Sequence, residues 1–276
     1  MMDTLPPKAT SPNVPATPHS LLVVLAHPDD ESLACGGLLA WSAAIGVRVS
    51  LLCLTHGEHG QTNNLKPPRR PHSLQEVRVA ELGQAAQILG ISEVIIGNHE
   101  DGMLPWLEAE PIESDIRQAV DRLQPDAVIT FGSDGLYWHP DHIAVHERTT
   151  AVIASLGDDA PALFYVTIPA GAMRAVVDHA AQIAAAQNLT TPSPRSILGV
   201  SDADAFGAEA AVPTLVIRTG KFSVLKLRAL ACHDSQLRDC ALPLIAAKDA
   251  PQLLGTEHYR RADVGAKGPS FLERFG

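Results

Sequence analysis

The strongest constraint on the fold is a charged cluster that directly follows a short apolar run. Residues 21–25 are apolar without a break, and residues 27–31 then read His-Pro-Asp-Asp-Glu. Five apolar residues bounded by a polar cluster are typical of a buried strand. Ligands of open α/β sheets bind at the carboxyl ends of the strands. We therefore expect the imidazole and carboxyl groups of this cluster at a binding edge.

A second cluster of the same kind occurs much later in the chain. Residues 127–131, Ala-Val-Ile-Thr-Phe, read as another strand, and residues 139–142 then read His-Pro-Asp-His. A catalytic zinc site needs three nitrogen, oxygen or sulfur ligands from the protein and one open position for water. Two such clusters at strand ends can supply these ligands, so the sequence predicts one divalent-metal site.

The spacing suggests which side chains hold the metal and which do the chemistry. His27 and Asp30 lie three residues apart across a strand-to-helix turn and can face one point, and His142 can supply the third ligand. Asp29, beside a ligand, is the candidate general base for a metal-activated water. His139 is the candidate for holding an oxyanion or protonating the leaving amine.

Other interpretations of these residues stay open at this level. Each cluster taken alone would also suit a capped helix start with a turn proline. His142 and His146 lie four residues apart on one helical face, so His146 is a reserve ligand.

Composition favours one α/β domain without a nucleic-acid or membrane partner. The 276 residues are 46% hydrophobic, and strand-like and helix-like segments alternate, which is typical of a Rossmann-like, mostly parallel sheet with helices on both faces. The net charge of −10 disfavours nucleic acid and anionic membranes. No apolar run is long enough to span a bilayer. Four dispersed cysteines without a CxxC pair indicate a reducing cytoplasm.

The chain is expected to divide into three parts. Residues 1–19 contain five prolines and read as a disordered tail. Residues 20–260 form the α/β domain, and residues 261–276 form a C-terminal tail within a polar, loosely ordered segment that starts at residue 255. Residues 61–71 are polar and proline-rich, which indicates a loop near the strand ends.

Two helices of this domain can be placed from local signals. Ser73 and Glu76 form a capping box for a helix over residues 73–90, which Gly90 ends. A second helix is expected over residues 221–236. No Gly-x-Gly-x-x-Gly motif follows the first strand, which disfavours a dinucleotide site.

Taken together, these motifs resemble the PIG-L/LmbE-like family of zinc-dependent N-deacetylases, which includes the N-acetylglucosaminyl deacetylases of mycothiol and bacillithiol biosynthesis. The two signatures are residues 26–31 and 139–142. Shorter matches follow in the expected order over roughly residues 20–260, namely residues 54–58, 78–81, 101–102 and 233–236. The family's fold is the Rossmann-like α/β fold expected above.

The resemblance implies a role for each matching residue. His27, Asp30 and His142 match the zinc ligands of the family. Asp29 matches its general base. His139 matches the residue that polarises the carbonyl oxygen or assists the leaving group.

Three further residues match substrate-binding or catalytic positions of the family. Arg78 matches an arginine that contacts the substrate, and Asp101 matches an acidic residue that contacts sugar hydroxyls. Tyr137 matches a mobile tyrosine that helps to stabilise the oxyanion.

We therefore expect a metal-dependent enzyme that removes the N-acetyl group from an N-acetylglucosamine-containing small molecule. Zn²⁺ is the expected cofactor, and Fe²⁺ is equally compatible with two histidines and a carboxylate. The expected partner is the N-acetylated amino-sugar substrate, and a homo-oligomer is compatible with loops at the strand ends. Two rivals are a thiol-conjugate amidase with the same site and a non-enzymatic protein with a structural metal.

Overall fold

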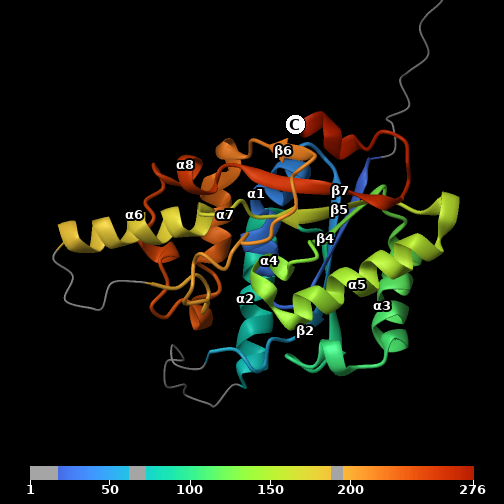
Figure 1. The fold of residues 1–276 in the computed structure, drawn as a ribbon, viewed down its shortest axis with the longest axis horizontal. Coiled ribbons are helices and arrows are strands. Elements are labelled where there is room, and N and C mark those ends of the chain that lie inside the picture. Colours follow the sequence, from blue (N-terminus) through green and yellow to red (C-terminus); the bar gives the residue numbers. More distant parts are fainter. Residues whose placement is uncertain (1–17, 62–72, 188–194) are drawn as a thin grey trace, which may run out of the picture.

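Seven strands form one sheet in a computed structural model that describes residues 18–61, 73–187 and 195–276 (Figure 1). The strands are β1 Ser20–Leu25, β2 Arg48–Thr55, β3 Glu93–His99, β4 Ala127–Phe131, β5 Ala162–Thr167, β6 Leu215–Ile217 and β7 Glu257–Gly265. Their order in the sheet is β3-β2-β1-β4-β5-β7-β6. Almost all of the predicted tail at residues 1–19 and of the predicted loop at residues 61–71 lies outside the described residues.

The path of the chain creates a binding crevice between β1 and β4. Strands β3, β2, β1, β4 and β5 are parallel, and the chain moves outward from β1 through β2 to β3 before it returns to pair β4 with β1. Such a reversal leaves a crevice at the carboxyl ends of the two central strands. The first cluster follows β1 and the second follows β4, so both lie at this crevice. The predicted Rossmann-like, mostly parallel α/β sheet is confirmed.

Two groups of helices flank the sheet. The α-helices of the described residues are α1 Asp30–Ala44, α2 Leu74–Leu89, α3 Ala109–Leu123, α4 Gly135–Trp138, α5 Pro140–Ser155, α6 Ala172–Ala186, α7 Ser223–Leu230 and α8 Ala250–Leu254. Helices α1, α2 and α7 pack on one another, and α3 packs on α5 on the other side of the strands (Figure 1). The predicted capping box of α2 is present, with Ser73 accepting from the Glu76 amide. In the described part of the chain no helix combines the length and apolar character that a membrane crossing requires.

The C-terminal segment belongs to the sheet, so the expectation of a loosely ordered end is wrong. Strand β7 runs antiparallel between β5 and β6, and the predicted boundary at residue 260 falls inside it. Tyr259 is buried in this strand, and Phe271 and Leu272 are buried beyond it. Six of the nine residues of β7 are partly buried or exposed, which explains why its composition looks polar.

The predicted helix over residues 221–236 is also shorter than expected. Helix α7 ends at Leu230, and after a turn the chain continues as a 3₁₀ turn over Asp234–Gln236. The side chains of His233 and Ser235 reach carboxylates of α1 and α2, and these long-range hydrogen bonds replace a continued helix. Local sequence carries no signal for such partners.

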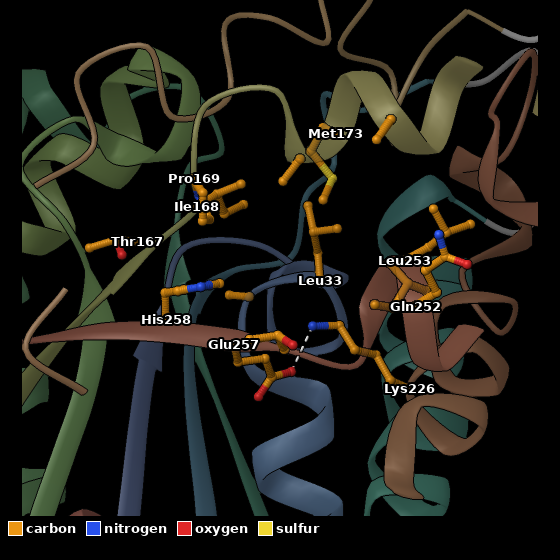
Figure 2. A pocket seen from close by; sticks show the side chains of 15 residues that line it. Leu33, Thr167, Ile168, Pro169, Met173, Lys226, Gln252, Leu253, Glu257 and His258 are labelled. Carbon is orange, nitrogen blue, oxygen red and sulfur yellow. Dashed lines mark hydrogen bonds and ion pairs between the residues drawn. The ribbon is translucent and has the colours of Figure 1, made fainter. Parts of the chain in front are cut away.

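A buried ion pair fastens β7 and α7 to a kink in α1. At Cys35 the backbone leaves the helical region, with φ −145° and ψ 16°. Beyond it the amides of Gly37 and Leu38 donate to the Glu257 carboxylate, each at 2.8 Å. The Lys226 ammonium lies 2.6 Å from the same carboxylate, beside a cavity of about 210 Å³ (Figure 2). The carboxylate therefore satisfies amides that the kink exposes.

Gly37→Ala is expected to destabilise the protein. A Cβ at this position would lie 2.5 Å from Oγ1 of Thr219, and overpacking of this kind typically costs about 1–3 kcal/mol. Gly83→Ala in α2 is the matched control, because a Cβ there would meet nothing within 4 Å. Alanine in place of an exposed helical glycine stabilises by about 0.5–1 kcal/mol. Denaturant unfolding should therefore give free-energy changes of opposite sign, and a stabilised Gly37→Ala would contradict the close packing.

Candidate metal centre and catalytic pocket

The first cluster is held in a tight turn between β1 and α1. The His27 amide donates to Oδ2 of Asp30 at 2.8 Å, which closes the turn. Asp29 lies between them with a left-handed backbone, φ 115° and ψ −25°. This turn places the side chains of His27, Asp29 and Asp30 at the carboxyl end of β1, where all three line one pocket.

Three donors from the two clusters meet at one point. Nδ1 of His27 lies 3.2 Å from Nε2 of His142. The Asp30 carboxylate lies 3.4 Å from Nδ1 of His27 and 3.2 Å from Nε2 of His142. All three side chains are buried. The structure thus brings together the three residues that the sequence nominated as metal ligands.

Neighbouring acceptors orient both imidazoles toward this point. Nε2 of His27 lies 3.0 Å from the carboxylates of both Asp101 and Asp141, so its proton faces away from Asp30. Nδ1 of His142 donates to the carbonyl of Gly135 at 3.1 Å. In the neutral rings, Nδ1 of His27 and Nε2 of His142 therefore carry lone pairs rather than protons, which is the tautomer that a metal ligand needs.

This donor set fits a divalent cation. Two imidazole lone pairs and a carboxylate at mutual distances of 3.2–3.4 Å repel one another unless a positive charge lies between them. Burial disfavours a charged His27, but hydrogen bonds to Asp101, Asp141 and Asp30 raise its pKa well above the usual value. The site therefore attracts positive charge, and two histidines with one carboxylate are a ligand set common to Zn²⁺ and Fe²⁺.

His139 lies beside these donors, but the proton of its neutral ring is on the nitrogen that faces the pocket. Its ring nitrogen lies within 4.8 Å of those of His27 and His142, so distance alone would allow it as a ligand. Its Nδ1, however, accepts from the Asp141 amide at 3.2 Å, which leaves the proton of the neutral ring on Nε2. Burial and the charges of His142 and His27 lower the pKa of His139 to about 4. His139 is thus a neutral hydrogen-bond donor at neutral pH.

Asp29 is held by an arginine and has a pKa suited to proton transfer. Nη2 of Arg78 lies 3.0 Å from Oδ2 of Asp29, and both side chains are buried. The guanidinium also donates to the carbonyls of Gly57 and Pro28, at 2.8 and 2.5 Å. Burial raises the pKa of Asp29 to about 7, although the charge of Arg78 opposes this shift. A carboxyl group with a pKa near neutrality can both accept and return a proton.

Tyr137 reaches the pocket from α4, a short helix with a strained backbone. The flanking Leu136 and Trp138 have φ values of 66° and 65°, which are rare for bulky residues. The ring of Tyr137 lies with its centroid 5.7 Å from that of His139 and 5.2 Å from that of His142. Burial raises the pKa of Tyr137 well above its usual value, so its hydroxyl keeps its proton at neutral pH.

The pocket has a volume of about 480 Å³, which is within the range of small-molecule sites. Seven of the eight site residues predicted from the sequence line it, namely His27, Asp29, Asp30, Arg78, Asp101, Tyr137 and His139. His142 is fully buried behind them. Asp101 also makes a hydrogen bond within the protein, since its Oδ2 accepts from the amide of His59 at 3.0 Å.

His146, the reserve ligand, lies apart from this cluster. Its Nδ1 donates to the carbonyl of Phe131 at 2.9 Å, and its ring contacts Tyr165. In the described part of the chain it belongs to neither group of converging metal donors. His142 therefore belongs to the donor cluster, whereas His146, one turn further along α5, only packs against the sheet.

Sequence reasoning predicted no partner for Glu31 and missed the backbone partners of Asp141, although Asp141 could be expected to orient a histidine ring, as it does for His27. Glu31 is completely buried and accepts from the amide of Asp29 and from Nε2 of His233. The side chain of Asp141 anchors the loop after β3 by accepting from the amides of Gly102 and Leu104. The motifs containing these residues were visible, but their partners lie far away in sequence.

Sequence comparison relates the chain to known deacetylases. Residues 22–153 match the PIG-L family, described as GlcNAc-PI de-N-acetylase. A 1D-myo-inositol 2-acetamido-2-deoxy-alpha-D-glucopyranoside deacetylase from Actinosynnema mirum is 30% identical over 279 residues, which cover 91% of this chain and 94% of that protein.

Solved structures share the fold. N,N'-diacetylchitobiose deacetylase from Pyrococcus horikoshii has a TM-score of 0.59 at 19% identity, covering 88% of this chain and 83% of its own. The 4-carboxy-2-hydroxymuconate hydratase GalB from Pseudomonas putida has a TM-score of 0.60 at 17% identity, covering 91% and 99%. One fold thus serves a deacetylase and a hydratase, and the activity has to be argued from the site.

Proposed function

Because the chain belongs to the PIG-L family of de-N-acetylases, we propose that it is a metal-dependent N-deacetylase. Its substrate is an N-acetylglucosamine-containing small molecule, because its relative from Actinosynnema mirum is a deacetylase of a 2-acetamido-2-deoxy-glucopyranoside. The chemistry is hydrolysis of the acetamide to acetate and a free amine. The four cysteines are free thiols, which supports a reducing cytoplasm as the place of action.

One observation carries this proposal: a three-donor cation site with an acid beside it in the same pocket. Asp30, His27 and His142 supply three donors, which is the number found in catalytic rather than structural zinc sites. His139 is not counted as a fourth ligand, because its Nδ1 accepts from the Asp141 amide and the proton of the neutral ring is then on Nε2. The adjacent Asp29 carboxylate is held by Arg78 and lines the pocket.

The proton transfers follow from the positions of these groups. A Zn²⁺ or Fe²⁺ ion held by His27, Asp30 and His142 would lower the pKa of a water molecule toward neutrality. Asp29 accepts the proton that the attacking water loses, and its carboxyl group then returns a proton to the amine that leaves. Arg78 keeps the Asp29 carboxylate aimed at the pocket.

Two donors suit the negative charge that develops on the acetyl oxygen. His139 presents its Nε2 proton to the pocket, and the hydroxyl of Tyr137 is protonated at neutral pH. Donors of this kind stabilise the tetrahedral oxyanion because they are already oriented when the charge forms. We assign both residues to oxyanion stabilisation.

The two substrate-binding residues suggested by the sequence have internal partners as well. Arg78 uses its guanidinium on Asp29 and on two carbonyls, so its main role is to position the base. Asp101 lies 3.0 Å from Nε2 of His27 and also lines the pocket. Although burial works in the opposite direction, the hydrogen bond from His27 holds the pKa of Asp101 at about 2. Asp101 is thus an anionic acceptor for a sugar hydroxyl.

The decisive experiment is a deacetylation screen over N-acetylglucosaminides, with free amine and acetate as separate readouts. We expect amine and acetate in equal amounts, loss of both after chelation, and recovery with Zn²⁺ or Fe²⁺. Release of a mercapturate-type fragment from a thiol conjugate without acetate would identify a conjugate amidase instead. A metal content of one ion per chain with no turnover of any amide would support a structural metal.

A further inference from the structure

The backbone of Asp29 adopts a conformation that needs support. Its φ of 115° lies in the left-handed half of conformational space, where a residue with a side chain is rare and strained. Strained residues of this kind persist only where the surrounding structure holds them, and they gather at functional sites. Asp29 is the proposed general base, so the direction of its carboxylate depends on this strained backbone.

A buried side chain from the next turn holds the Asp29 backbone. Oε2 of Glu31 accepts from the Asp29 amide at 3.0 Å. Glu31 has no exposed surface, and its other oxygen accepts from Ser32 at 2.5 Å and from Nε2 of His233 at 2.9 Å. His233 is itself fully buried and comes from a segment that follows α7. The carboxylate of Glu31 therefore links the base to a residue about two hundred positions away.

We infer that Glu31 and His233 are positioning residues for the general base: they hold Asp29 in its left-handed conformation and so aim its carboxylate at the pocket. Neither side chain lines the pocket. The inference rests on the proposed function in so far as it gives Asp29 the role of base. His233 fixes the Glu31 carboxylate, and Glu31 fixes the Asp29 amide.

A plainer interpretation is that these contacts only dock the segment over residues 233–236 onto the helices. The chain contains a matched control for that interpretation. Glu81 of α2 accepts from the amide and the hydroxyl of Ser235, at 2.8 and 2.7 Å, and is also buried. Glu81 and Glu31 thus hold the same segment through neighbouring residues, and only Glu31 also contacts Asp29.

The test compares Glu31→Ala with Glu81→Ala. If Glu31 positions the base, Glu31→Ala should lower kcat by about 10²-fold, because misplacing a catalytic group by about 1 Å costs that much. KM and the metal content per chain should stay near the wild-type values. Glu81→Ala should reduce thermal stability as Glu31→Ala does but leave kcat nearly unchanged. Equal losses of kcat in the two variants would overturn the inference.

Two further variants keep the test decisive if Glu31→Ala does not fold. Glu31→Gln retains an oxygen that can accept from the Asp29 amide, so this variant should keep most of the wild-type kcat. In the His233→Ala variant, kcat should fall while the metal is retained, because Glu31 loses the partner that fixes it. A crystal structure of Glu31→Gln or His233→Ala supplies a readout that does not depend on activity. A His233→Ala structure with Asp29 and Glu31 in unchanged positions would overturn the inference. This holds even if the wild-type protein hydrolyses no acetamide.

Discussion

Asp29→Asn is expected to abolish nearly all turnover while the protein keeps its metal. An asparagine has the same size and can still accept from Arg78 through its Oδ1, so the pocket should keep its shape. It cannot take up a proton from the attacking water. General-base catalysis typically contributes about 10²–10⁴-fold, and kcat should fall by that factor. The measurements are kcat and KM on the best acetamide of the screen, together with metal content by elemental analysis.

Asp121→Asn in α3 is the control for this substitution, because Asp121 is an exposed residue outside the pocket lining. It should retain wild-type kcat and metal content. Full amidase activity in Asp29→Asn would remove Asp29 from the role of base and leave the Asp29–Arg78 pair as a structural contact. Loss of metal in Asp29→Asn would instead place Asp29 among the ligands.

The elements that frame the site could be predicted because their signals are local. The apolar runs of β1 and β4 end at the two clusters, and the box formed by Ser73 and Glu76 marks the start of α2. Burial of a strand and capping of a helix depend on residues a few positions apart. The order of these elements then implied the parallel sheet and the crevice between β1 and β4.

The parts that could not be predicted depend on partners distant in sequence. Strand β7 pairs with β5 and β6, so its place in the sheet is set by registers such as Tyr165 against Arg260. Helix α7 stops early because His233 turns toward Glu31. Neither feature leaves a periodic pattern in its own segment, and tertiary contacts override local propensity there.

The two histidines of α5 show the same limit of prediction from sequence. His142 and His146 look equivalent by spacing, since residues four apart share a helical face. The end of β4 distinguishes them: the ring of His142 stacks on Phe131 with centroids 3.9 Å apart, whereas Nδ1 of His146 donates to the carbonyl of the same phenylalanine. Only the packing of α5 on β4 decides which imidazole reaches Asp30.

That difference makes His142→Ala and His146→Ala a matched pair with opposite outcomes. His142→Ala removes one of three donors from the cation site, so metal and turnover should be lost together. Removing an outer-shell partner typically weakens metal binding by about 10–100-fold, and loss of a direct ligand should weaken it more. His146→Ala should keep one metal per chain and wild-type kcat, with a stability loss of about 1 kcal/mol from the missing hydrogen bond.

The measurement for this pair is the metal bound per chain after dialysis, followed by turnover in the presence of added Zn²⁺ or Fe²⁺. The donor geometry requires that His142→Ala stay nearly metal-free at concentrations that saturate the wild type. A His142→Ala protein with full metal content would show that the cation is held elsewhere, for example by the second donor group of His27, Asp101 and Asp141. That group is the weaker candidate because the Asp141 carboxylate already accepts from the amides of Gly102 and Leu104.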